Sequence, residues 1–99
     1  MPSGKLRVRW LKTAIRNLEA EADYIAQDNP GAASDVVRKI YEATDRLKQH
    51  PALGRSGRVP ETRELIVPGT PYIVPYRIKG KHIEILRVFH AARRWPKSF

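Results

Sequence analysis

The stretch that decides the fold is residues 62–96, TRELIVPGTPYIVPYRIKGKHIEILRVFHAARRWP. It contains three runs rich in β-branched and aromatic residues, at about 62–67, 71–78 and 82–89. Two short turn sequences separate these runs, Pro68-Gly69-Thr70 and Lys79-Gly80-Lys81, and both contain residues that tight turns favour. The pattern predicts three consecutive β-strands joined by hairpins, followed by a short basic tail.

Two details of these runs predict how the strands are placed. Pro75 has no N–H to donate to a ladder, so we expect a bulge or a sheet edge at this position. The run at 82–89 is apolar except for Glu84 and Arg87. A nearly continuous apolar run is typical of a strand in the centre of a sheet.

Upstream, the pattern predicts a strand at about 5–11, a helix at about 13–27, a second helix at about 30–50 and a loop at 51–61. Leu6, Val8 and Trp10 alternate with arginines, as in a half-buried strand. The helices follow from apolar residues at the helical period, with Thr13 and Asn29 as the expected N-caps. The short connection between them indicates an antiparallel helical hairpin.

These elements predict one domain spanning residues 1–99, of the α+β class, with the order β-α-α-β-β-β. We expect an antiparallel sheet with the N-terminal helical hairpin on one face. The other face should be partly open and lined by arginine and tyrosine, which is typical of a binding surface.

Composition limits the function further. The chain has a net charge of +9 and no cysteine, which excludes disulfides and thiolate metal sites. Residues 51–99 hold ten Lys/Arg against three Asp/Glu, whereas residues 1–50 hold nine against seven. This asymmetry favours a polyanion or an acidic protein as partner. No apolar run is long enough to span a membrane, and the first ten residues are too polar for a secretory signal. We therefore expect a cytoplasmic protein.

His90 is the first candidate for a chemical role, because it follows the last predicted strand and lies close in sequence to Arg87, Arg93 and Arg94. A histidine can move a proton near neutral pH, and arginines can hold a phosphate and stabilise charge that develops on it. This combination would suit cleavage of RNA by its own 2′-hydroxyl. The alternative is a structural histidine whose ring nitrogens tie the C-terminal tail to the sheet.

The arginines of the loop and strands form a second candidate site, which comprises Arg55, Arg58, Arg63 and Arg77. Together with Tyr72 or Tyr76 they could grip single-stranded nucleic acid, phosphate by guanidinium and base by ring. The alternative is that the tyrosines belong to the core and that the arginines pair with Glu61, Glu64 and Glu84.

No cofactor or metal is predicted. His82 and Glu84 share a strand face, but no third ligand stands near them in the sequence except His90. There is also no glycine-rich phosphate loop and no recognisable Ser/His/Asp spacing.

Six short motifs, in order along nearly the whole chain, together resemble one family. They are ADYIA at 22–26, Asn29-Pro30-x-Ala32-Ala33, Leu47-x-x-His50-Pro51-x-Leu53-Gly54-Arg55-x-Gly57, TREL at 62–65, YIVPYR at 72–77 and Val88-x-His90-x-x-Arg93-x-Trp95-Pro96. With this order and spacing, the chain resembles the RelE/ParE superfamily of toxins from bacterial type II toxin–antitoxin modules.

The resemblance implies the β-α-α-β-β-β fold, a bacterial cytoplasmic protein, growth arrest and a possible part in plasmid stabilisation. It also implies a cognate antitoxin whose flexible segment wraps over the toxin and neutralises it. The charge of +9 suits an acidic segment that folds on binding.

The superfamily divides by target. Members similar to RelE cut mRNA on the ribosome without a metal, and members similar to ParE inhibit DNA gyrase. If the chain is a nuclease, the resemblance makes His90, Arg63 and Arg77 the catalytic candidates. For a partner or nucleic acid, the binding candidates are Arg55, Arg58, Arg63, Arg77, Arg87 and Arg93.

The motifs match neither branch fully. Ala91 follows His90 where such nucleases have tyrosine, and Tyr72 falls roughly where they place an arginine. These departures favour inhibition of gyrase by binding, with ribosome-dependent cleavage of mRNA as the alternative. A third hypothesis is a protein of the toxin fold that acts mainly as an antitoxin-bound co-repressor.

Overall fold

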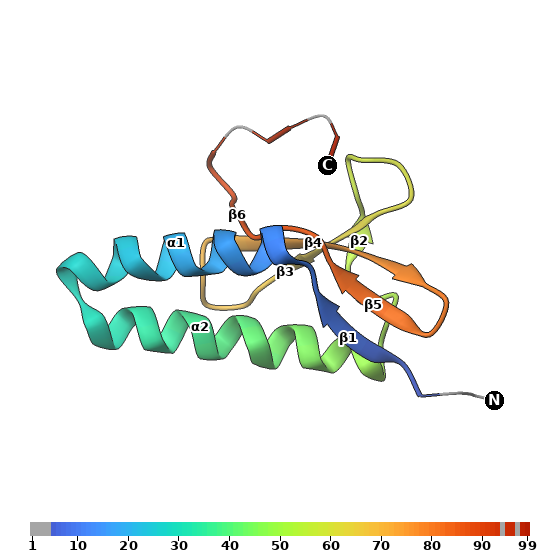
Figure 1. The fold of residues 1–99 in the computed structure, drawn as a ribbon, viewed down its shortest axis with the longest axis horizontal. Helices are drawn as coiled ribbons and strands as arrows, with labels where there is room; N and C mark the ends of the chain where they lie inside the picture. The colour runs from blue at the N-terminus through green and yellow to red at the C-terminus, as the bar shows by residue number, and fades with distance from the viewer. Residues whose placement is uncertain (1–4, 94, 97) are drawn as a thin grey trace.

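The computed structural model describes residues 5–93, 95, 96, 98 and 99. Their elements follow the expected order (Figure 1): β1 (Arg7–Trp10), α1 (Lys12–Asp28), α2 (Pro30–Asp45), the 3₁₀ turn η1 (Arg46–Lys48), β2 (Arg55–Ser56), β3 (Arg63–Ile66), β4 (Tyr72–Lys79), β5 (His82–Ile85) and β6 (Phe89–His90). The α+β class and the helical hairpin between the first strand and the others are therefore confirmed.

The helical hairpin forms where local signals place it. The side chain of Asn29 accepts a hydrogen bond from the amide of Ala32 at 3.0 Å, and Pro30 opens α2. The expected cap at Thr13 is wrong, because α1 begins at Lys12 and its N-cap residue, Leu11, makes no side-chain cap. The second helix is shorter than expected, because its last turn tightens into η1.

The sheet is mixed, with the strand order β1-β5-β4-β3-β2 and with β6 also paired to β4. Every pairing is antiparallel as predicted except one, because β1 runs parallel to β5, with Arg7 opposite His82 and Trp10 opposite Ile85. The central position of β5 between β1 and β4 is confirmed. The expectation of a wholly antiparallel sheet was wrong because periodicity identifies strands without identifying their partners.

A bulge interrupts the last predicted strand beside Pro75. Tyr76 pairs with Ile85, but Ile73 pairs with Phe89, so the strand containing β5 and β6 has one extra residue between these pairs. The carbonyl of Pro75 accepts the amide of Leu86 at 2.9 Å. The predicted bulge is confirmed, although its extra residue lies in the partner strand. It reverses the alternation, so residues beyond it face the opposite way from those before it.

The core lies between the helices and one face of the sheet (Figure 1). The helices contribute mainly Ala14, Leu18, Ile40, Ala43 and Leu47, and the strands contribute Leu65, Val74, Tyr76, Ile83 and Ile85. We call the sheet face turned away from the helices the open face. None of the described helices is long and apolar enough to cross a membrane.

The C-terminal tail packs on the open face beside β6. The ring of Phe89 lies 4.7 Å from that of Trp95 and 5.9 Å from that of Phe99, between ring centroids. The guanidinium of Arg58 lies 3.8 Å from the centre of the Trp95 ring, and that of Arg87 lies 5.2 Å from Phe99. The tail therefore covers one end of the open face, while Arg94 falls outside the described residues.

Candidate functional site

Arg55 and Arg58 share one buried carboxylate on the open face. The side chain of Glu64 is 3% exposed; its Oε1 lies 3.1 Å from Arg55 Nη2, and its Oε2 lies 3.3 Å from Arg58 Nε. The backbone N–H of Arg58 also donates to Oε2 at 2.8 Å. The pairing of these loop arginines with Glu64, which the sequence left as the alternative, is the arrangement observed.

A second buried carboxylate, Glu84, lies between Arg77 and Arg9 on the same face. Arg77 Nε donates to it at 2.7 Å, and Arg9 Nη1 lies at 3.3 Å. The hydrogen bond from Arg77 lowers the pKa of the Glu84 carboxyl below its ordinary value of 4.5, and burial opposes this only in part. Arg9 also lies 3.1 Å from Nε2 of His82. His82 and Glu84, which share a strand face, are therefore both in contact with arginine side chains.

Arg63 faces the helical side of the sheet, opposite to Arg77. Its Nη1 donates to the carbonyl of Gly54 at 2.8 Å. Beside it, the Tyr76 hydroxyl donates to the carbonyl of Pro51 at 2.7 Å and accepts the amide of Gly54 at 2.9 Å. Burial raises the pKa of Tyr76. Arg63 and Tyr76 therefore anchor the loop at 51–61 to the sheet. The expectation that Arg63 lines the open face is wrong.

His90 lies at the other end of the sheet, in a network with the tail and α1. Its ring contacts Tyr72 edge-on at 5.6 Å between centroids, and its Nδ1 accepts the amide of Ala92 at 3.2 Å. The Tyr72 hydroxyl donates to Glu21 at 2.9 Å, and Arg93 pairs with the second oxygen of Glu21. Burial, followed by the hydrogen bond to Glu21, raises the pKa of Tyr72 to about 12.

The structure thus separates residues that the sequence names together as catalytic or binding candidates. Arg55, Arg58 and Arg77 lie on the open face, with Arg87 beside the tail that covers it, whereas His90 and Arg93 lie on the helical side. The bulge is the reason: without its extra residue, strict alternation would place His90 on the same face as Glu84. Glu21 carries no signal that sequence reasoning could use, because it lies 51 residues from its partner Tyr72.

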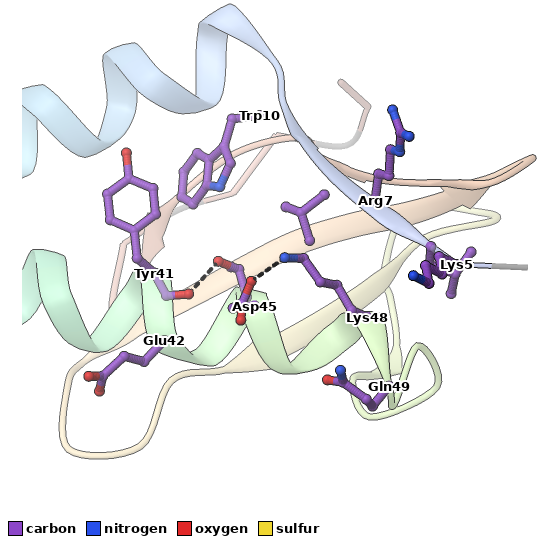
Figure 2. A pocket seen from close by; sticks show the side chains of 11 residues that line it. Lys5, Arg7, Trp10, Tyr41, Glu42, Asp45, Lys48 and Gln49 are labelled. Atoms are coloured by element: carbon purple, nitrogen blue, oxygen red, sulfur yellow. Dashed lines mark hydrogen bonds and ion pairs between the residues drawn. The ribbon is translucent and has the colours of Figure 1, made fainter.

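A groove of about 990 Å³ lies between β1 and the C-terminal part of α2, which continues into η1 (Figure 2). The rings of Trp10 and Tyr41 stand at one end, 5.0 Å apart between centroids. Lys5, Arg7 and Lys48 give the other end positive charge, although Lys48 pairs with Asp45 at 2.7 Å. β1 pairs only with β5 among the described strands, so its outer edge borders this groove. The groove could not be predicted from the sequence, because it joins two distant elements.

Among the described residues, no cluster of three or more His, Asp or Glu side chains has the geometry of a metal site. His82 and Glu84 are both held by arginine, so neither presents an unengaged ligand set.

Comparison with known proteins identifies the family. Residues 8–95 match the family described as the ParE toxin of the type II toxin–antitoxin system parDE. A putative toxin, Y4kP, from Sinorhizobium fredii is 47% identical over 91 residues, which cover 92% of this chain and 94% of that protein. Toxin RelE2 from Caulobacter vibrioides is 33% identical over 87 residues, covering 88% of this chain and 97% of that protein.

Solved structures agree with this assignment. The chromosomal ParDE toxin–antitoxin system from P. aeruginosa contains a chain that matches with a TM-score of 0.80 and 33% identity, over 89% of this chain and 98% of that one. The toxin–antitoxin complex RelBE2 from Mycobacterium tuberculosis matches with a TM-score of 0.58 and 27% identity, over 88% and 99%. The chain therefore belongs to the ParE toxin family of type II toxin–antitoxin systems.

Proposed function

We propose that this toxin arrests growth by binding a protein target, DNA gyrase, in the cytoplasm. The observation that carries the proposal is the separation of His90 from the arginines of the open face. Cleavage of RNA by its 2′-hydroxyl needs a proton acceptor and cationic groups that converge on one phosphate. In this toxin His90 faces the helical side of the sheet and Arg55, Arg58 and Arg77 lie on the other, while Arg93 beside His90 is paired with Glu21.

The groups around His90 also suit a structural role. Nδ1 is occupied by the amide of Ala92, and the charge of Arg93 is offset by Glu21. Tyr72 is buried, and with a pKa of about 12 its hydroxyl stays protonated at neutral pH. These contacts tie the tail to the sheet and to α1, which supports the interpretation of His90 as a structural residue.

A ribosome-dependent ribonuclease is the alternative function, and one observation favours it. His90, Tyr72 and Arg93 line one surface hollow of about 420 Å³, next to Tyr24 and Pro71. A substrate phosphate that displaced Glu21 from Arg93 would bring a cation and an imidazole to the same place. The similarity to a toxin named RelE2 is consistent with this alternative.

Two assays on the same variants distinguish the proposals. We expect the toxin to inhibit supercoiling by purified gyrase, and His90→Ala and Arg63→Ala to leave toxicity largely intact. Thermal melting checks that each variant is folded, since Arg63 also holds the loop. Primer extension on translated mRNA after induction provides the opposing test. Codon-specific cleavage that disappears in His90→Ala would overturn the gyrase proposal.

We also propose that a cognate antitoxin occupies the groove between β1 and α2. The groove offers an aromatic end for an apolar anchor and a basic end for acidic side chains. The outer edge of β1 can accept an extended segment as an added strand. An acidic, amphipathic segment of the antitoxin fits all three features.

A further inference from the structure

We propose that the open face of this toxin carries a second binding surface, which grips the sugar–phosphate backbone of duplex DNA. The surface consists of two rows of side chains that cross β1, β5 and β4. The register places Arg7, His82 and Lys79 side by side in one row, and Arg9, Glu84 and Arg77 in the other. We call these six positions the basic rows.

The basic rows are accessible and strongly cationic. They present four Lys/Arg side chains against the single carboxylate of Glu84, which is buried beneath two of them. Even while paired, the side chains of Arg9 and Arg77 remain 52% and 43% exposed. Arg7 and Lys79 are exposed, and Lys81 extends the charge at the β4–β5 turn.

The position of the rows leaves room for a long ligand. β1, β5 and the β4–β5 turn form the end of the molecule opposite to the α1–α2 connection (Figure 1). The C-terminal tail contacts Phe89, Arg58 and Arg87, none of which belongs to the rows.

The chemistry of the rows favours a phosphate backbone over a protein. Neighbouring rows lie about 7 Å apart along the strands, and the outer strands lie about 10 Å apart, so the cations can reach several successive phosphates. A protein interface is usually anchored by buried aromatic or aliphatic side chains at its centre. None of the six positions carries such a side chain.

The same residues favour a duplex over a single strand. Proteins that bind single strands stack the bases on aromatic rings. The only ring in the rows is the imidazole of His82, and Arg9 contacts its Nε2 at 3.1 Å. A duplex needs no stacking platform, because its bases already stack on one another.

The test measures how binding to DNA depends on salt. Full-length toxin, separated from its antitoxin, is titrated by fluorescence anisotropy into a labelled 20-base-pair DNA duplex between 50 and 200 mM NaCl. Four phosphate contacts predict a slope of log K against log salt of about −3 to −4. The double variant Arg7→Ala/Lys79→Ala is expected to make this slope shallower by about 2.

A matched control distinguishes the effect of the basic rows on DNA binding from the effect of overall charge. Arg38→Ala/Lys39→Ala removes the same charge from α2, whose residues do not belong to the rows, and is expected to leave the slope nearly unchanged. The conservative double variant Arg7→Lys/Lys79→Arg should bind as the wild type does, and circular dichroism verifies that all variants are folded.

Three outcomes would overturn the inference: no binding at 50 mM salt, an equal loss in both alanine doubles, or tighter binding to single-stranded DNA or duplex RNA of the same length. The assay uses naked DNA and contains no gyrase. Its failure would therefore leave the proposed target untouched, and failure of the gyrase assay would leave this inference standing.

Discussion

Two glutamates, Glu64 and Glu84, are buried on the open face, which the sequence predicts to be lined by arginine and tyrosine. Burying a carboxylate costs free energy unless charged hydrogen bonds compensate it. Each glutamate receives two arginines, and Glu64 also accepts a backbone N–H. Much of the positive charge of the open face is therefore engaged in holding the sheet together, and only the excess is available to a partner.

The pKa of Glu84 predicts how stability depends on pH. Because the folded state lowers this pKa below 4.5, the contribution of Glu84 to the free energy of unfolding is fully present above about pH 4.5. It is lost as the pH falls through the folded-state pKa. We expect wild type to be more stable than Glu84→Gln at pH 7, by a margin that shrinks toward pH 3.

Urea denaturation followed by tryptophan fluorescence at several pH values measures this margin. Glu61→Gln, at an exposed position, serves as the control and should differ from wild type by a constant amount. A margin for Glu84→Gln that stays constant from pH 7 to pH 3 would contradict the assigned ion pair.

Single elements show what a sequence can and cannot predict. The helical hairpin and the β-hairpin turns could be predicted, because their signals are local: Asn29 caps α2, and Gly69 and Gly80 adopt positive φ at the turns. The partner of β1 could not be predicted, since β1 and β5 are joined only through space. The face of His90 was also beyond prediction, because one extra residue in the bulge decides it.

The loop before β3 depends on the absence of a side chain at Gly54. A Cβ added there would lie 2.6 Å from Cε1 of Tyr76 and 2.8 Å from its hydroxyl oxygen. Tyr76 is fully buried, so it has little room to move. We expect Gly54→Ala to lower the free energy of unfolding by about 1–3 kcal/mol.

The same substitution at Gly31 provides the control for this prediction. Gly31 lies in α2, where an added Cβ has only an ordinary contact at 3.5 Å and alanine is the better helix former. Gly31→Ala should leave stability unchanged or raise it. Equal melting temperatures for the two alanine variants would show that the contact between Gly54 and Tyr76 is not tight in solution.

At the scale of the whole molecule, three surfaces occupy different parts of one small sheet, and Arg7 belongs to two of them. The groove lies between β1 and α2, the basic rows lie on the open face, and the network of His90 lies beside α1. The sequence predicts functional charge in the C-terminal half, but the basic rows also include Arg7 and Arg9, and Lys5 and Lys48 line the groove. Charge and aromatic content do not record which face a residue occupies, and they give no sign of the groove.

The groove predicts which aromatic residue of the toxin contributes most to binding of the antitoxin. Tyr41 is 46% exposed and forms the aromatic end of the groove with Trp10. We expect Tyr41→Ala to weaken antitoxin binding at least tenfold, as measured by isothermal titration calorimetry, because a buried aromatic anchor is typically worth 1–2 kcal/mol or more.

Tyr24, on α1 beside the hollow that His90 lines and away from the groove, is 64% exposed and serves as the matched control. Tyr24→Ala should change the affinity for the antitoxin by much less than Tyr41→Ala. If the two variants bind the antitoxin equally well, the antitoxin does not use this groove.

The parallel pairing of β1 with β5 also has a consequence for synthesis of the toxin. Arg9 and Glu84 are 75 residues apart, so β1 has no strand to pair with until the ribosome has made nearly the whole chain. At typical rates of translation these 75 residues take about 4–15 s, and the helical hairpin, once it is complete, exposes its apolar stripe until β5 follows. Pairing at such separation is also intrinsically slow. The nascent toxin therefore passes through a period in which it is prone to aggregate and presents neither the groove nor the basic rows.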